Sequence, residues 1–284
     1  MATSPTSSAK PDLRPLFPEL ERRLIRLLRA CSAEDWGKPT IAGQWTVKDV
    51  TAHLLDTSLR RLSMARDGFY GEKPEIGSYQ DLVDFLNRLN ADWVKAMRRV
   101  SPAILIEQLE SSSAAVHQYF QSLDLSAPAP FSVAWAGEQA SENWFDIARE
   151  YTERWHHQQQ IRLALGRESG DDAITSRELY FPVLDTFMYA LPHHYRDRTA
   201  TEGVIVRANV SGAAGGSWCI QRTGGEWKLS QTQREATAEV TIPDDIAWRV
   251  VTKGISRADA IARSSVHGDR ALAEHIFSML SIMA

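Results

Sequence analysis

A carboxylate and an imidazole lie four residues apart in one segment, where Glu153 is followed by His157. Residues at positions i and i+4 lie one above the other on a helix face, so these two side chains can converge on one point. Metal ligands must converge in this way, and a catalytic metal site needs further protein ligands while it leaves positions open for water or substrate. His53, in a second segment of helical spacing, is the best candidate for the third ligand. The pattern predicts a metal site formed by His53, Glu153 and His157.

The same residues also allow plainer interpretations. Glu-x-x-x-His occurs on many helices by chance, as a solvated pair worth about 0.2–0.5 kcal/mol. His53 would then be a hydrogen-bonded histidine on a half-buried face. His156 lies about 100 degrees around the helix from His157, and we interpret it as a residue behind the ligands or on the surface. Gln160 could hydrogen-bond a ligand or the backbone, and Glu150 could orient a ligand, although we favour water as its partner.

Helices must position these residues. Thr46 and Asp49 have the spacing of a capping box, which predicts the start of a helix that carries His53. A longer helix is predicted over residues 141–166, and it carries both Glu153 and His157. With about five helices joined by short connections, the first half of the chain favours an antiparallel bundle. Its predicted core includes Leu20, Leu24, Val50, Leu54, Leu86 and Ile147.

The pattern changes near residue 170. One more helix is predicted over about 176–191, followed by strand-like runs that are separated by glycine-rich turns. A helix follows Pro243, and a last helix follows the turn that contains His267, Gly268 and Asp269. Strands followed by helices favour a small α+β domain with an antiparallel sheet. We therefore expect a disordered lead over residues 1–10, a bundle over 11–170 and an α+β domain over 171–284.

Composition excludes several classes of function. The 284 residues carry a net charge of −4, which does not suggest nucleic acid or an anionic membrane as a partner. No apolar run approaches the roughly 20 residues of a membrane-spanning helix. The two cysteines, Cys31 and Cys219, are predicted to be free thiols in a reducing cytoplasm. We expect a cytoplasmic protein that is a monomer or a homodimer.

The two motifs together resemble the DinB-type four-helix-bundle superfamily, and within it the mycothiol-dependent maleylpyruvate isomerase family. The family uses glutamate where many other members of the superfamily have a histidine, and Glu153 stands at that position. The second half of the chain resembles the sterol-carrier-like domain that this family carries at its C-terminal end. The residues that carry the bundle resemblance are Trp45, Thr46, Asp49, His53, Leu54, Glu153, His157, Gln160 and Ile161.

The resemblance implies an enzyme with a divalent metal, zinc first and nickel as the alternative, and a low-molecular-weight thiol such as mycothiol as cosubstrate. A metal lowers the pKa of a coordinated thiol and holds it as the thiolate. Addition of the thiolate to a conjugated double bond, rotation and loss of the thiol would isomerise a small electrophile. Retention of the thiol would make the enzyme an S-transferase.

Substrate and thiol contacts are less defined by the resemblance. The family places an arginine from the C-terminal domain near the metal, and Arg207, Arg222 and Arg234 are the candidates here, against the alternative that each is a solvated strand residue. Trp45 and Gln160 are candidates for cofactor binding. The alternative function is a non-catalytic metal-binding protein or a lipid- or small-molecule-binding protein.

Overall fold

The computed structural model describes residues 10–72, 74–171 and 173–282. They form two compact units. The helical unit contains residues 12–130 and 153–174, and the sheet unit contains mainly residues 131–152 and 175–282. Apart from Lys10, the predicted disordered lead lies outside the described residues. The predicted division into independent domains at residue 170 stays a prediction.

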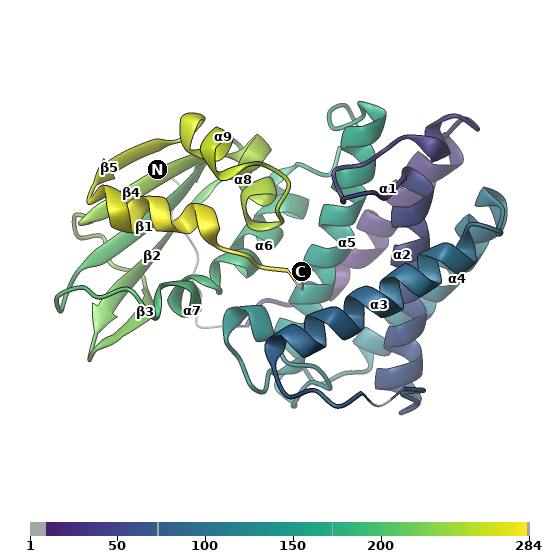
Figure 1. Ribbon diagram of the computed structural model, residues 1–284, viewed down its shortest axis with the longest axis horizontal. Coiled ribbons are helices and arrows are strands. Elements are labelled where there is room, and N and C mark those ends of the chain that lie inside the picture. The colour runs from purple at the N-terminus through teal and green to yellow at the C-terminus, as the bar shows by residue number, and fades with distance from the viewer. Residues whose placement is uncertain (1–9, 73, 172, 283–284) are drawn as a thin grey trace. The chain divides into compact units, whose positions relative to one another are not determined.

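Long helices build the helical unit (Figure 1). Their apolar faces meet in one core, to which Leu24, Val50, Leu109 and Ile161 each contribute from a different helix. The helices are α1 (Phe17–Arg29), α2 (Val47–Arg60), α3 (Tyr79–Met97), α4 (Pro102–Gln121) and the second part of α5 (Asn143–Leu165).

The predicted core residues do not all lie in this core. Leu20, Leu24, Val50 and Leu54 are buried in the helical unit as expected. Leu86 is only half-buried, because α3 lies outside the other helices and buries Val83 and Val94 instead. Ile147 is buried, but it belongs to the sheet unit, since α5 is divided between the two units.

Helix α2, which carries His53, is fixed at its N-terminus. Thr46 Oγ1 accepts a hydrogen bond from the Asp49 amide at 3.3 Å, and the Asp49 carboxylate accepts one from the Thr46 amide at 3.1 Å. The predicted capping box is therefore present. Lys48 Nζ donates to the Arg98 carbonyl at 2.9 Å, and Trp93 Nε1 donates to the Ala52 carbonyl at 2.9 Å. These contacts hold α2 against α3, and α2 continues into a π-helical turn, Arg61–Arg66.

The sheet unit holds a five-stranded sheet in the order β3-β2-β1-β4-β5 (Figure 1). Alternate residues of β4, Ala238, Val240 and Ile242, are buried, as expected for a strand with one face in the core. The helix α10 covers β1 and β4. The strands are β1 (Ile205–Ser211), β2 (Gly216–Thr223), β3 (Glu226–Ser230), β4 (Ala238–Pro243) and β5 (Ser265–Gly268), and the helices are α6 (Arg177–Met188), α7 (Leu191–Tyr195), α8 (Asp244–Val251), α9 (Arg257–Ala262) and α10 (Arg270–Glu274).

The α+β fold class is confirmed, but the sheet is not wholly antiparallel. Strands β1 and β4 pair in parallel, with Val206 opposite Ala238 and Val210 opposite Ile242. Parallel pairing needs a long connection between the two strands. The β2–β3 hairpin supplies that connection, and it leaves one edge of β1 open for β4.

Two predictions for the C-terminal end are corrected by the structure. His267 lies in the edge strand β5, which pairs with β4, and not in a turn. The last helix was expected to continue through Ile276, Phe277 and Leu280, but α10 ends at Glu274 and a 3-10 turn, His275–Ser278, follows it. Strand β5 has only four residues, and most of them are polar or small. The sequence pattern cannot distinguish so short a strand from a turn.

Replacement of Thr46 by alanine should lower the free energy of unfolding by about 1 kcal/mol, because the first turn of α2 loses its side-chain acceptor. Urea unfolding followed by circular dichroism measures the change. Ser111→Ala, on the exposed face of α4, should change the free energy by less than about 0.5 kcal/mol. Equal effects of the two substitutions would show that the cap does not stabilise α2.

Candidate metal centre

Helix α5 carries Glu153 and His157 into the helical unit. The segment around them is strongly polar, yet its side chains are buried. Trp155 Nε1 donates to the Ile174 carbonyl at 2.8 Å, which ties the helix to the end of the unit. Because α5 is fixed in this way, its functional side chains have defined directions.

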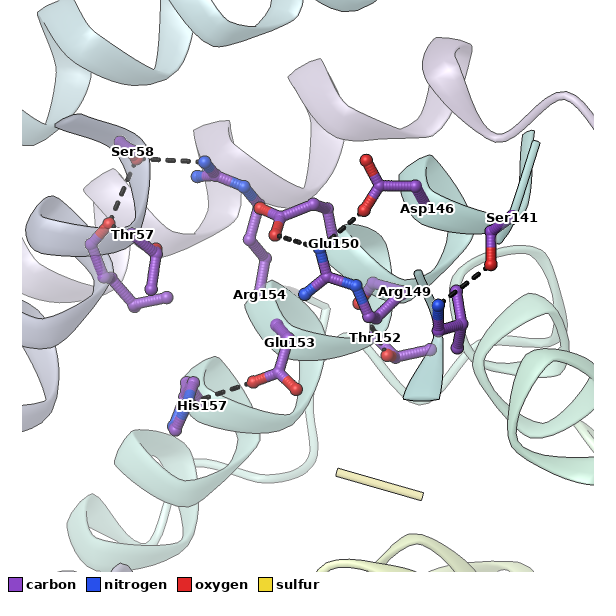
Figure 2. Close-up of polar contacts among 12 residues, drawn as sticks. Thr57, Ser58, Ser141, Asp146, Arg149, Glu150, Thr152, Glu153, Arg154 and His157 are labelled. Atoms are coloured by element: carbon purple, nitrogen blue, oxygen red, sulfur yellow. Dashed lines mark hydrogen bonds and ion pairs between the residues drawn. The ribbon is translucent and has the colours of Figure 1, made fainter. Parts of the chain in front are cut away.

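Glu153 and His157 converge as predicted (Figure 2). The distance from His157 Nε2 to Glu153 Oε2 is 3.5 Å. Two ligand atoms on a tetrahedral zinc ion, each about 2.0–2.1 Å from the metal, lie about 3.4 Å apart. The two side chains therefore already have the spacing of neighbouring metal ligands.

Gln160 contacts the ring of His157. The distance from His157 Nδ1 to Gln160 Oε1 is 2.8 Å, and both side chains are buried. When this carbonyl oxygen accepts from Nδ1–H, Nε2 is left with its lone pair for a metal. Metal-binding histidines commonly have such a partner for their second nitrogen.

His53 approaches the pair from α2. Its ring lies 4.8 Å from the His157 ring, centroid to centroid, in an edge-to-face arrangement. His53 is 6% exposed, and its Nδ1 atom has no hydrogen-bond partner among the described residues. Burial lowers the pKa of His53 well below its ordinary value, and the positive charge of Arg60 acts in the same direction. His53 is therefore neutral and has a buried nitrogen without a partner, as a metal ligand requires.

The structure also places His156 beside Glu153, although the sequence interpretation did not include it among the metal ligands. Glu153, His156 and His157 form the group in which all donor atoms lie within 4.8 Å of one another, and His53 is outside that group. His156 Nδ1 is 3.9 Å from Glu153 Oε2, and His156 is 2% exposed. Residues three apart on a helix are neighbours, so the imidazole of His156 can turn back toward Glu153 even though it lies about 100 degrees around the helix from His157.

Two further side chains around the centre are placed by the structure. Trp45 is half-buried, and its ring lies 4.9 Å from the His53 ring. Glu150 is buried and 3.2 Å from Arg149, so it does not face water as we had favoured. The strong polarity of the segment favoured solvent exposure in the sequence, whereas Glu150 is buried beside the guanidinium of Arg149.

A pocket of about 420 Å³ lies beside the same face of α2. Asp56 and Arg60 line it, together with the aromatic side chains of Phe69, Phe85 and Trp93. Residues 53, 56 and 60 have the spacing of one helix face. Arg60 Nη2 lies 3.1 Å from Asp56 Oδ2 and donates to Asn90 Oδ1 at 2.7 Å. The sequence interpretation missed Arg60, although its distance of seven residues from His53 indicated a shared face.

The arginines predicted to contact substrate lie in the sheet unit. Arg207 Nη1 is 3.3 Å from Glu239 Oε2, and its Nη2 donates to the backbone carbonyl of Arg234 at 2.6 Å. Arg222 lies over the Trp227 ring, 5.8 Å from its centroid. Arg234 is exposed. Within the sheet unit, Arg207 and Arg222 thus both have partners of their own.

A comparison with models of protein families shows to which family the chain belongs. Residues 17–162, which include all three predicted ligands, match the model of the mycothiol maleylpyruvate isomerase N-terminal domain. The chain belongs to this family. The mycothiol maleylpyruvate isomerase family is the one that the motifs around His53 and Glu153 indicated. A comparison with curated protein sequences gives no match.

Two solved structures are similar to the chain. The first is a mycothiol-dependent maleylpyruvate isomerase, with 13% identity and a TM-score of 0.51, covering 84% of this chain and 86% of the other. The second is a histidine-to-alanine variant of a mycothiol-dependent maleylpyruvate isomerase, with 12% identity, a TM-score of 0.51 and the same coverage. At this identity the likeness shows the fold. Among the described helices, none is long and apolar enough to cross a membrane.

The pH dependence of stability tests the environment of Asp56. Burial raises the pKa of Asp56 from 3.8 to about 6. Between these pH values the unfolded chain loses the proton while the folded chain keeps it, so stability falls as the pH rises. Relative to the metal-free parent protein, Asp56→Asn should therefore gain roughly 2 kcal/mol in free energy of unfolding between pH 4 and pH 7.5. Ser63→Ala, in the same pocket, should follow the parent, and parallel curves for all three proteins would contradict the raised pKa.

Proposed function

We propose that the chain is a metal-dependent enzyme that uses a low-molecular-weight thiol, such as mycothiol, to isomerise or conjugate a small electrophile. The observation that carries the proposal is the pair of His157 Nε2 and Glu153 Oε2, 3.5 Å apart, in a domain of the mycothiol maleylpyruvate isomerase family. Three protein ligands, His53, Glu153 and His157, would leave positions for a thiol and water.

The donor set suits a divalent metal. Two neutral imidazoles and a carboxylate favour zinc, with nickel as the alternative. The unpaired Nδ1 of buried His53 supports its role as a ligand, since an imidazole nitrogen without a partner is costly to bury. His156 is the alternative third ligand, because its Nδ1 lies near Glu153.

Each residue has a distinct task in the proposed reaction. A bound divalent metal would lower the pKa of a coordinated thiol and supply the thiolate. Gln160 would hold the proton on His157 Nδ1 and keep Nε2 directed at the centre. Trp45 would wall the site beside His53 and exclude water from it. The described cysteines need no part in the chemistry, because the thiol comes from the cosubstrate.

If the electrophile carries a carboxylate group, the site also needs a positively charged side chain to bind that group. Arg60 is the candidate that the helical unit offers, since it lies in the pocket beside α2 and its charge already acts on His53. Its Nε has no hydrogen-bond partner among the described residues, so a substrate carboxylate would find a donor there. Phe85 and Trp93 would contact the apolar part of the thiol or the electrophile. Arg207 and Arg222 remain the candidates from the sheet unit.

Metal analysis tests the ligand set. The purified protein loaded with zinc or nickel should hold about one ion per chain. His53→Ala and His157→Ala should each lose most of the bound ion, because each removes one of three protein ligands. His117→Ala, a histidine on α4 outside the centre, should keep the ion. Elemental analysis after dialysis measures the content.

His156→Ala separates the two possible ligand sets. With His53 as the third ligand, His156→Ala keeps the metal and His53→Ala loses it. The reverse result would assign the ion to Glu153, His156 and His157. Full occupancy in all of the single variants would refute the proposed centre.

Activity tests the chemistry. The protein, its metal and a panel of cellular thiols should convert a dicarboxylate such as maleylpyruvate or an uncharged alkyl halide, and Glu153→Ala should abolish this turnover. Arg60→Gln should raise the KM for the dicarboxylate about tenfold or more, with little effect on the uncharged substrate. Arg66→Gln, an exposed arginine beyond the pocket, is the matched control. Equal rates with and without metal would favour the non-catalytic metal-binding or lipid-binding alternative.

A further inference from the structure

A second cavity, larger than the pocket beside α2, lies between α1 and α4 of the helical unit. Its volume is about 740 Å³, within the range of pockets that hold small molecules. It shares no lining residue with the group of Glu153, His156 and His157. Arg154 reaches this cavity from α5, because its side chain leaves the helix about 100 degrees away from that of Glu153 (Figure 2).

Both apolar and polar side chains line the cavity. Phe17 and Ile25 on α1 and Ala114 on α4 form apolar walls. Glu21, Ser113 and Arg154 supply polar groups. An apolar cavity with a few converging polar groups is the usual arrangement of a small-molecule site.

Arg154 places a buried positive charge at the cavity. It is 4% exposed, and it donates from Nη2 to Ser58 Oγ at 2.9 Å and from Nη1 to Ser113 Oγ at 3.3 Å. The carboxylate of Glu21 lies 3.7 Å from Nη1, too far for a close ion pair. Burial also raises the pKa of Glu21, which favours its neutral form. The buried positive charge is therefore only partly compensated, which is unfavourable unless an anion completes the site.

Unpaired polar atoms point to the same conclusion. Among the described residues, Glu21 Oε1, Arg154 Nε and His117 Nδ1 are buried without a hydrogen-bond partner. All three belong to side chains that line this cavity. A polar group bound in the cavity would supply partners for these atoms.

We propose that the cavity between α1 and α4 binds a small amphipathic anion, with a carboxylate at Arg154 and an apolar body against Phe17 and Ile25. The carboxylate pairs with the guanidinium of Arg154, which lines the cavity and whose Nε has no hydrogen-bond partner among the described residues. Four arginines line the cavity against two glutamates, Glu21 and Glu110, so its lining carries a net positive charge that attracts an anion, although Arg22 pairs with Glu19 and Arg29 with Glu110. A second copy of the chain is a less suitable occupant, because Arg154 and Ser113 are buried side chains that a flat partner face would not reach. The site is independent of the function proposed for the metal centre.

The experiment uses the full chain and two probes of equal shape, 2-naphthoate and the uncharged 2-naphthalenemethanol, in calorimetric titrations. Naphthoate should bind once per chain, and the alcohol should bind at least about tenfold more weakly, because it cannot pair with Arg154. Naphthoate should bind equally well after the metal has been removed with a chelator, which separates this cavity from the metal centre.

Ala114→Trp is the decisive variant. Ala114 is exposed at the cavity wall, so a tryptophan there fills the cavity without disturbing the core, and naphthoate affinity should fall at least about tenfold. Ala103→Trp, an exposed position on α4 outside the cavity, should leave the affinity unchanged. Arg154→Gln, provided that its circular dichroism spectrum is unchanged, should abolish the preference for naphthoate over the alcohol.

Four results would overturn the proposal. These are the absence of naphthoate binding, equal affinities for the two probes, wild-type affinity in Ala114→Trp, and loss of binding when the metal is removed. A solution dimer that Ala114→Trp converts to monomers, in a protein that does not bind naphthoate, would assign the face to contact between copies.

Discussion

Helix α5 buries polar side chains, and the rest of the helical unit must supply partners for them. A buried polar group without a partner destabilises a protein by about 1–3 kcal/mol, so the surrounding helices are constrained in both position and side-chain type. Ser58 on α2, Ser113 on α4 and the Ile174 carbonyl satisfy part of this demand. The buried polar residues of this stretch are Arg154, His156, His157, Gln158, Gln159, Gln160 and Arg162.

Buried polar atoms that lack a hydrogen-bond partner indicate where a ligand could bind. Among the buried nitrogens without partners in the described part of the chain are His53 Nδ1, beside the metal centre, and Arg154 Nε, in a side chain that lines the cavity between α1 and α4. Both residues have packed surroundings and defined directions, so the missing partner is not explained by a loose side chain. A ligand at each place would complete the hydrogen bonding that the helices begin.

Local patterns in the sequence predicted the parts of this arrangement that depend on helix geometry. Glu153 and His157 meet because they are four residues apart, and Thr46 pairs with Asp49 because a helix start exposes its amides. The fold class followed from the order of helices and strands. These features need only the spacing of residues along one element, which the sequence contains directly.

Contacts between elements could not be predicted in the same way. Glu150 was expected to face water because charged residues mostly do, and His156 to lie behind the ligands or on the surface, but both side chains are buried in the structure. The parallel pairing of β1 and β4 depends on which edge of β1 is open after the hairpin forms. Arg60 could have been found from its helix face, yet its pocket exists only because α3 packs against α2.

The division of α5 between the two units has a consequence for protein synthesis. Residues 12–130 of the helical unit are made first, then a stretch that belongs to the sheet unit, and only then residues 153–174. Until that last stretch leaves the ribosome, the apolar faces around Val50 and Leu109 lack Ile161, and the nascent chain exposes surface that a chaperone can bind. The same interleaving means that neither unit corresponds to one uninterrupted stretch of coding sequence. A recombination event with a single crossover between residues 131 and 174 would therefore divide both units.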